Sequence, residues 1–172
     1  MSKPATADAR AKILGRDELR LRLEKHRQRG ESIVLTNGCF DVLHVGHARY
    51  LKGAKHEGDV LVVAVNSDAS TKQLKGEGRP ILSEQARAEL VAAFAAVDYV
   101  VIFSEPNVEA LLTELRPAVH AKGTDYSAET VPEREIAGRL GIRVAIVGDP
   151  KDHSTRDMLA RVRDAELGNR HG

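Results

Sequence analysis

The chain has 172 residues, the size of one domain, and is long enough to bury a hydrophobic core without disulfides or structural metals. Hydrophobic residues make up 42% of it and charged residues 30%, with a formal net charge of +1, which excludes a disordered chain and a polybasic nucleic-acid binder. The single cysteine, Cys39, cannot form an internal disulfide, and no apolar run approaches the roughly 20 residues that cross a bilayer.

In chain order, short β-branched runs alternate with amphipathic stretches. A charged helix is expected over 17–29, inside an N-terminal extension that covers residues 1–30. Five strands are predicted after it, at 32–36, 60–66, 99–103, 118–122 and 142–147. The intervening helices are predicted at 46–55, 83–95, 107–115 and 132–140, with a closing helix at 154–167 and a tail at 168–172.

This alternation predicts an α/β fold of the Rossmann-like, doubly wound kind, in which a parallel five-stranded sheet carries helices on both faces. Three of the predicted strands are apolar nearly throughout, as expected for strands that are covered on both sides. We therefore expect one domain over residues 31–167. In such sheets the ligand crevice lies beyond the carboxyl ends of the strands, near the point where the strand order reverses.

Small, polar and cationic residues follow four of the five predicted strands. The first strand leads into NGCFDVLHVGH, and the second into Asn66 to Asp68 and then a loop with the sequence KQLKGEGRP. KGTDY follows the fourth strand and GDPKDHST the fifth. Loops are usually polar, so each stretch alone is weak evidence, but their convergence at one edge of the sheet predicts a binding site there.

The stretch after the first strand has the features of an anion site. Gly38 and Gly46 permit close approach of the backbone, and a helix that begins near Gly46 would direct its positive dipole end at the crevice. The spacing fits neither the dinucleotide fingerprint nor the Walker phosphate loop. His44 and His47 lie about one helical turn apart and could donate hydrogen bonds to the same phosphoryl group.

These residues resemble a known family. NGCFDVLHVGH is similar to the first signature of the HxGH nucleotidyltransferase superfamily, in its cytidylyltransferase-like branch. The resemblance runs from about residue 12 to the last predicted helix, through AVNSDASTKQLKGEGRPI, KGTDY and the late pair Ser154 and Thr155. Within that branch the chain is most similar to the bacterial adenylyltransferases that make ADP-heptose, a lipopolysaccharide precursor.

The resemblance implies transfer of AMP from ATP to a sugar 1-phosphate, D-glycero-β-D-manno-heptose 1-phosphate, with release of pyrophosphate. It further implies Mg²⁺ that accompanies ATP, with no metal held by the protein alone, and a homodimer whose substrate comes from a separate sugar kinase. We expect no nucleic-acid or membrane partner. A cytoplasmic location is expected, because the first ten residues lack the apolar segment of a secretory signal.

The resemblance also implies roles for individual residues. The catalytic set would be His44, His47 and Lys75. The nucleotide would be bound by Gly38, Cys39, Phe40, Gly46, Lys122, Gly123, Asp125, Tyr126, Ser154 and Thr155. The substrate would be bound by Asp68, Lys72 and Arg79, of which Asp68 would also order the loop that follows the second strand.

The late motif departs from the family pattern. Arg156 stands where relatives carry a second threonine, and His153 replaces a residue that is often small or apolar. An arginine that the glycerol 3-phosphate branch uses ahead of this motif is missing, with Asp149 and Lys151 near its place. These differences weaken a glycerol reading, and the charges of Lys151, His153 and Arg156 would compensate for the loss.

Other interpretations are open from the sequence. Cys39, His44 and His47 could bind zinc, although a structural zinc site needs four ligands and no further pair supplies the rest. The chain could be a regulatory nucleotide-binding module without turnover, or a CTP-dependent enzyme that acts on glycerol 3-phosphate or another phosphorylated acceptor. The histidines could also be structural, Lys122 could pair with a carboxylate, and Lys72, Lys75 and Arg79 could belong to a solvated loop.

Overall fold

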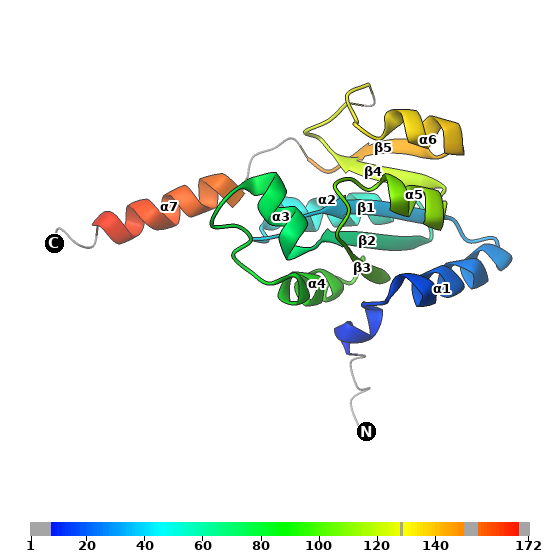
Figure 1. Ribbon diagram of the computed structural model, residues 1–172, viewed down its shortest axis with the longest axis horizontal. Helices are drawn as coiled ribbons and strands as arrows, with labels where there is room; N and C mark the ends of the chain where they lie inside the picture. Colours follow the sequence, from blue (N-terminus) through cyan, green and yellow to red (C-terminus); the bar gives the residue numbers. More distant parts are fainter. Residues whose placement is uncertain (1–7, 128, 150–154, 169–172) are drawn as a thin grey trace.

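The computed structural model describes residues 8–127, 129–149 and 155–168, apart from the side chains of 155–157 and 166–168. Figure 1 shows a twisted sheet with helices packed around it. The five strands are β1 (Ile33–Gly38), β2 (Val60–Asn66), β3 (Tyr99–Phe103), β4 (Val119–Gly123) and β5 (Arg143–Val147). The helices are η1 (Ala9–Lys12), α1 (Arg16–Gln28), α2 (Val45–Lys55), α3 (Asp68–Lys75), α4 (Glu84–Ala92), α5 (Glu109–Leu115), α6 (Arg134–Leu140) and α7 (Thr155–Gly168).

The sheet has the strand order β3-β2-β1-β4-β5, and all four pairings are parallel. The predicted α/β Rossmann-like architecture is therefore confirmed. The chain builds β1, β2 and β3 outward in one direction and then returns to add β4 on the other side of β1. The strand order thus reverses between β1 and β4, which is where a parallel sheet of this kind opens its ligand crevice.

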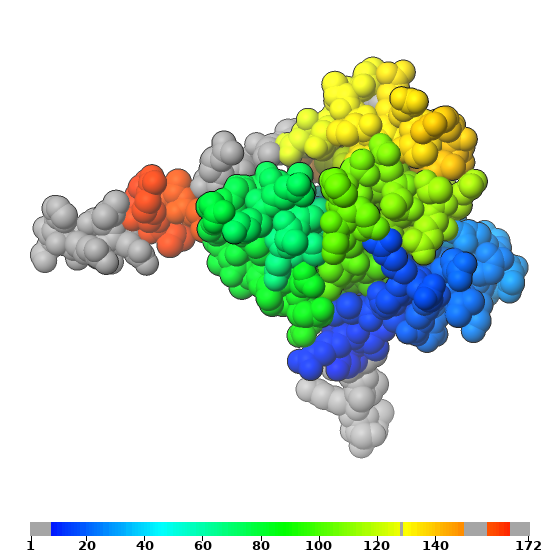
Figure 2. All heavy atoms as spheres, viewed as in Figure 1, coloured from blue at the N-terminus to red at the C-terminus, as the bar shows by residue number. Residues whose placement is uncertain are grey.

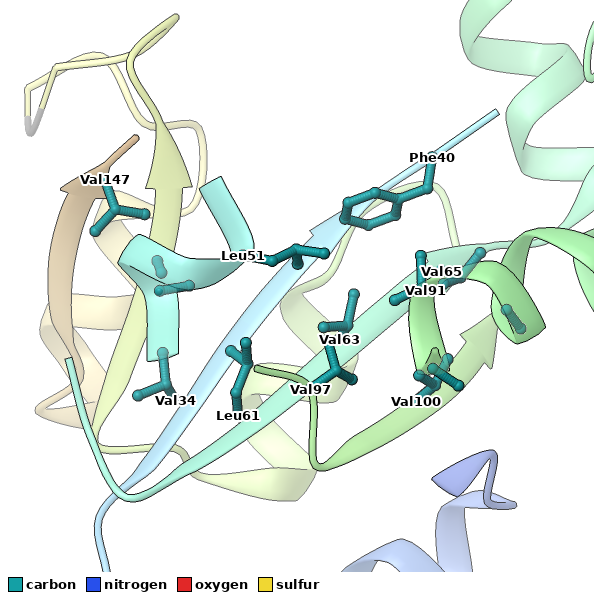
Figure 3. Packing of buried hydrophobic residues seen from close by; sticks show 14 of the residues in the cluster. Val34, Phe40, Leu51, Leu61, Val63, Val65, Val91, Val97, Val100 and Val147 are labelled. Atoms are coloured by element: carbon teal, nitrogen blue, oxygen red, sulfur yellow. The ribbon is translucent and has the colours of Figure 1, made fainter. Parts of the chain in front are cut away.

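Two hydrophobic layers cover the sheet. On one face α2 and α4 pack on the strands, and Leu51, Ala54, Ala88 and Val91 are fully buried there. Figure 3 shows this layer from close by, with Leu51 above the strands and Phe40 reaching toward it from the loop after β1. On the other face α1, α5 and α6 supply the buried residues. Every residue of β2 is buried, as its apolar run predicted.

The expected N-terminal helix is present and is part of the core. Leu19 and Leu23 of α1 are fully buried against the sheet and α5. Just before this helix, Ile13 forms a parallel bridge with Val100 of the edge strand β3, and the Leu14 N–H donates to the Val100 carbonyl at 2.9 Å. Figure 2 shows this segment, in dark blue, lying directly against the body of the protein. The pairing of Ile13 and Leu14 with β3 thus covers part of an otherwise open sheet edge.

One expected loop is a helix instead. The sequence predicts a loop over residues 72–80, but α3 spans Asp68–Lys75, so the first four residues of that stretch are helical. Ser67 precedes the helix and its hydroxyl accepts a hydrogen bond from the Ser70 N–H at 3.2 Å, as N-cap residues do. Ser70 and Thr71 are buried against β2, so tertiary packing stabilises a short helix that is mostly polar.

The last described element, α7, begins at Thr155, close to the expected start, and extends away from the sheet in Figure 1. Ser154 lies outside the described residues, as do His153, Lys151 and the tail from residue 169 onward. None of the described helices combines the length and the apolar composition that crossing a bilayer requires.

Candidate active site

The loop between β1 and α2 lies where the strand order reverses, and its path depends on Gly38 and Phe40. Phe40 has a positive φ of 49° and places its ring, which is 4% exposed, in the core layer that Figure 3 shows. A Cβ atom on Gly38 would lie only 3.1 Å from that ring, so a larger residue at this position would push the ring away. Cys39 between them is half-buried, with its sulfur 3.9 Å from the Asn66 side-chain oxygen.

His44 and His47 meet at the first turn of α2. His44 is the N-cap residue, and its Nδ1 accepts a hydrogen bond from the Gly46 N–H at 3.1 Å. His47 returns the arrangement, because its Nδ1 accepts from the His44 N–H at 3.2 Å. The two ring centroids are 4.1 Å apart. The predicted pairing of the two imidazoles is therefore present, and it also serves as a capping box for the helix.

These hydrogen bonds decide where the imidazole protons are. A neutral imidazole carries one proton, and here each Nδ1 accepts from a backbone N–H, so each proton must be on Nε2. Burial lowers the pKa of His47 to about 4, with a further contribution from nearby His44. Near pH 7 His47 is thus a neutral ring whose Nε2–H is a hydrogen-bond donor.

The predicted substrate residues after β2 are only partly brought to the crevice. Lys72 and Lys75 lie in the second half of α3 and are exposed, and Lys72 pairs with Glu77 at 3.2 Å. Asp68 is the first residue of α3, and its carboxylate accepts a hydrogen bond from the buried Arg87 at 2.8 Å. Asp68 therefore makes a structural contact with Arg87. The sequence predicts that Asp68 orders a loop, but it is the first residue of a helix.

Arg79 also has an internal partner. Its side chain is 19% exposed, and its Nε lies 3.0 Å from the carboxylate of Asp41, which is 3% exposed. The same carboxylate accepts the backbone N–H groups of Ile81 and Leu82, at 2.7 and 3.0 Å. Arg79 thus takes part in holding its own segment to the loop after β1, a contact that we did not expect from the sequence.

Sequence reasoning missed Asp41 and Arg87 as functional candidates. Arg87 is fully buried in α4, where it donates to the Leu82 carbonyl at 3.0 Å, to the Cys39 carbonyl at 2.5 Å and to Asp68. A usable signal was present, since an arginine that lies beside alanine and valine on the apolar side of a predicted helix is expected to have a buried partner.

The fourth strand brings a buried cation to the same edge. Lys122 lies 3.2 Å from Glu133, and both side chains are less than a tenth exposed. Its ammonium also lies 3.5 Å from the Asn37 side-chain oxygen and 4.9 Å from the centre of the Tyr126 ring. The neighbouring His120 is buried, which lowers its pKa to about 3. Lys122 therefore pairs with a carboxylate, which is one of the two roles that the sequence leaves open for it.

The remaining nucleotide candidates follow directly after Lys122. Gly123 ends β4, and its carbonyl accepts from the Tyr126 N–H at 3.1 Å, which turns the chain at Asp125. Tyr126 and Asp125 are exposed, with Tyr126 at 37%. Thr155 begins α7 but its side chain is outside the described part of the chain, so the expected contacts of Ser154 and Thr155 remain predictions.

No group of three or more His, Cys, Asp or Glu side chains within residues 8–127, 129–149 and 155–168 is placed to hold a metal ion. In that part of the chain Cys39 does not join the two histidines in a zinc-type cluster, which a structural zinc site would require.

Comparison with known proteins assigns this chain to a family. The family model described as cytidylyltransferase-like matches residues 35–157. The bifunctional protein HldE of Pelobacter propionicus is 46% identical over 158 residues, which covers 92% of this chain and 32% of that protein. HldE of Syntrophotalea carbinolica is 46% identical over 154 residues, which covers 90% and 31%. The chain thus spans about a third of the length of these relatives.

Two solved structures share the fold. A lipopolysaccharide core biosynthesis protein from Thermoplasma volcanium is 29% identical, with a TM-score of 0.61, and the match covers 71% of this chain and all of that protein. Pantothenate synthetase from Thermus thermophilus has a TM-score of 0.57 over 83% of this chain and 63% of its own, but at 17% identity it supports the fold alone. With the family model matched from β1 to the start of α7, the chain belongs to the cytidylyltransferase-like family.

Proposed function

We propose that this protein is an adenylyltransferase that transfers AMP from ATP to D-glycero-β-D-manno-heptose 1-phosphate and forms ADP-heptose and pyrophosphate. The observation that carries the proposal is the pair of imidazoles, His44 and His47, at the first turn of a helix where the strand order reverses. The similarity to HldE proteins and to a lipopolysaccharide core biosynthesis protein supports the choice of a heptose acceptor.

In this reaction an oxygen of the acceptor phosphate attacks the α-phosphorus of ATP. The bond from that phosphorus to the bridging oxygen breaks, and pyrophosphate leaves with the electron pair. No protein nucleophile is needed, so positioning and charge stabilisation supply the rate enhancement. The Nε2–H groups of His44 and His47 would donate to the α-phosphoryl oxygens, where negative charge accumulates in the transition state. The lowered pKa of His47 keeps that ring neutral near pH 7, with its Nε2–H available as a preorganised donor.

The other site residues would bind the two substrates. Lys75, which is exposed at the end of α3, would contact a substrate phosphate, with Lys72 and Arg79 as supporting cations. The loop of Gly38, Cys39, Phe40 and Gly46 would approach the nucleotide, as would Lys122, Gly123, Asp125 and Tyr126 after β4. Ser154 and Thr155 would add hydroxyl groups to the triphosphate contacts.

We further propose that Mg²⁺ enters with ATP. Magnesium is usually held by one or two carboxylates together with substrate phosphates and water. The ion would neutralise the triphosphate and assist the departure of pyrophosphate.

The proposal extends to the setting of the reaction. A kinase must phosphorylate the acceptor sugar, and we propose that a separate sugar kinase does this. We also propose a homodimer in the cytoplasm, where ATP is abundant. Analytical ultracentrifugation of the full chain tests the dimer directly.

The decisive experiment is a panel of nucleotides and acceptors, read by pyrophosphate release. The purified chain is offered ATP or CTP with Mg²⁺, in combination with heptose 1-phosphate or glycerol 3-phosphate. Release that requires both ATP and heptose 1-phosphate supports the proposal, and loss of the signal with EDTA supports the metal. Release with CTP would establish the cytidylyltransferase alternative instead. Tight ATP binding without release in any combination would indicate a regulatory module.

A further inference from the structure

We propose that Asp41 is a positioning residue, whose buried carboxylate holds segment 79–82 against the loop that carries His44 and His47. Through this segment it would set the distance between the cations of the acceptor site and the two imidazoles. The kinetic part of this inference rests on the proposed adenylyl transfer, whereas the structural part does not.

Both oxygens of the Asp41 carboxylate contact the protein, although among the described residues only Oδ1 has hydrogen-bond partners. Oδ1 accepts two consecutive backbone hydrogen bonds, from Ile81 at 2.7 Å and from Leu82 at 3.0 Å. Oδ2 forms an ion pair with the Arg79 guanidinium, whose Nε lies 3.0 Å away. The side chain is only 3% exposed. A carboxylate buried to this degree is costly unless it is hydrogen-bonded and paired, and here all three contacts come from one segment.

A second buried group holds the same segment from the other side. Arg87 donates to the Leu82 carbonyl at 3.0 Å and to the Cys39 carbonyl at 2.5 Å. The backbone N–H of Leu82 therefore donates to Asp41, and the backbone carbonyl of Leu82 accepts from Arg87. Arg87 also donates to Asp68 at 2.8 Å, which links the start of α3 to the same point.

These contacts fix both ends of the cationic stretch. Residues 72–78 between them are exposed and carry Lys72 and Lys75, so their position depends on the start of α3 and on segment 79–82. Buried ion pairs are poor contributors to stability, because apolar residues of similar size would do as well. The location of this one, between the histidine loop and the acceptor segment, favours a role in geometry.

Hydrogen exchange tests the contact itself. The Ile81 and Leu82 amides of the full chain are followed by NMR in the wild type, in Asp41→Ala and in Asp41→Asn. Asparagine keeps an oxygen that can accept both N–H groups, so we expect exchange about tenfold faster or more in Asp41→Ala and close to wild type in Asp41→Asn. Unchanged exchange in Asp41→Ala would overturn the proposal. If Asp41→Ala does not fold, faster exchange in Arg79→Gln supports the proposal and unchanged exchange overturns it.

Kinetics test the consequence. Asp41→Asn places an amide N–H opposite the Arg79 guanidinium, so we expect kcat/KM for the acceptor to fall about tenfold or more, with the KM for ATP changed less than about twofold. The matched control is Asp98→Asn, because Asp98 also accepts a backbone N–H, from Leu61 at 2.7 Å, and pairs with Lys55 at 2.5 Å, but lies at the amino-terminal ends of β2 and β3.

The two failures are distinguishable. An equal loss for both substrates, or an equal loss in Asp98→Asn, would assign Asp41 to general stability and overturn the positioning role. If the wild type transfers no nucleotide to any acceptor, the proposed function fails, while the exchange rates of Ile81 and Leu82 still decide whether Asp41 holds the segment.

Discussion

The rings of His44 and His47 lie 4.1 Å apart, and the Nδ1 atom of each accepts a backbone N–H from the first turn of α2. The same two atoms that cap the helix therefore orient both Nε2–H groups as donors. A helix cap and the proposed pair of catalytic donors are thus built from the same side chains. Substitution must separate these roles before either can be assigned.

His44→Asn offers this separation, because an asparagine side chain is a good N-cap but has no imidazole. We expect a thermal stability close to wild type and a turnover lower by about 10² or more, the scale of losing one positioned donor. Steady-state pyrophosphate release and a melting curve on the same preparation measure both. His56→Ala, at the exposed far end of α2, is the control, and near-wild-type turnover in His44→Asn would remove the ring from the mechanism.

Stability should depend on two buried histidines in mildly acidic solution. Burial lowers the pKa of His47 from 6.5 to about 4 and that of His120 from 6.5 to about 3. Between these values the unfolded chain binds more protons than the folded one, so the free energy of unfolding is highest above about pH 6.5 and decreases as the pH falls. We expect a loss on the order of 1–2 kcal/mol for each histidine by about pH 5.

Urea unfolding at a series of pH values measures this effect. The window from about pH 6.5 to 5 lies above the pKa of about 4 that carboxyl groups ordinarily have, so protonation of histidines dominates the change there. His120→Gln should flatten the pH dependence, whereas His56→Gln should leave it unchanged. An equally steep decrease in His120→Gln would show that His120 is not the origin of the effect.

Lys75 is exposed at the last position of α3 and has no ion pair with the described residues. Lys75→Ala should raise the KM for one substrate and leave kcat nearly unchanged, provided that the ammonium binds the ground state and the transition state alike. Saturation curves for each substrate at a fixed excess of the other measure this. Lys25→Ala, on the exposed side of α1, is the control, and unchanged curves for both substrates would exclude Lys75 from the site.

The leading helix can be tested with two leucines two positions apart. Leu23 of α1 is fully buried, whereas Leu21 of the same helix is 62% exposed. Leu23→Ala should lower the free energy of unfolding by about 2–5 kcal/mol, since it opens a cavity in the core. Leu21→Ala should change it by less than about 0.5 kcal/mol. Chemical denaturation compares the pair, and equal effects would mean that α1 does not pack as described.

The sequence predicted the strands well because burial on both faces leaves an unambiguous apolar run, as in Val60–Asn66. It failed at Asp68–Lys75, where only Ala69 and Leu74 are apolar and the helix depends on the Ser67 cap and on Ser70 and Thr71 packed against β2. A short polar helix of this kind has little intrinsic preference to reveal, and its stability comes from its neighbours.

The five strands, the parallel α/β architecture and the adjacency of His44 and His47 followed from the sequence alone, because hydrophobic periodicity and motif spacing are local properties. Only the tertiary structure decided that Arg79 pairs with Asp41, that Arg87 binds Asp68, and that both imidazoles carry their protons on Nε2. The two arginine contacts join residues 19 or more positions apart, and the proton positions depend on hydrogen bonds that a motif does not encode. Such contacts form only when the folded chain buries charges that must then find partners.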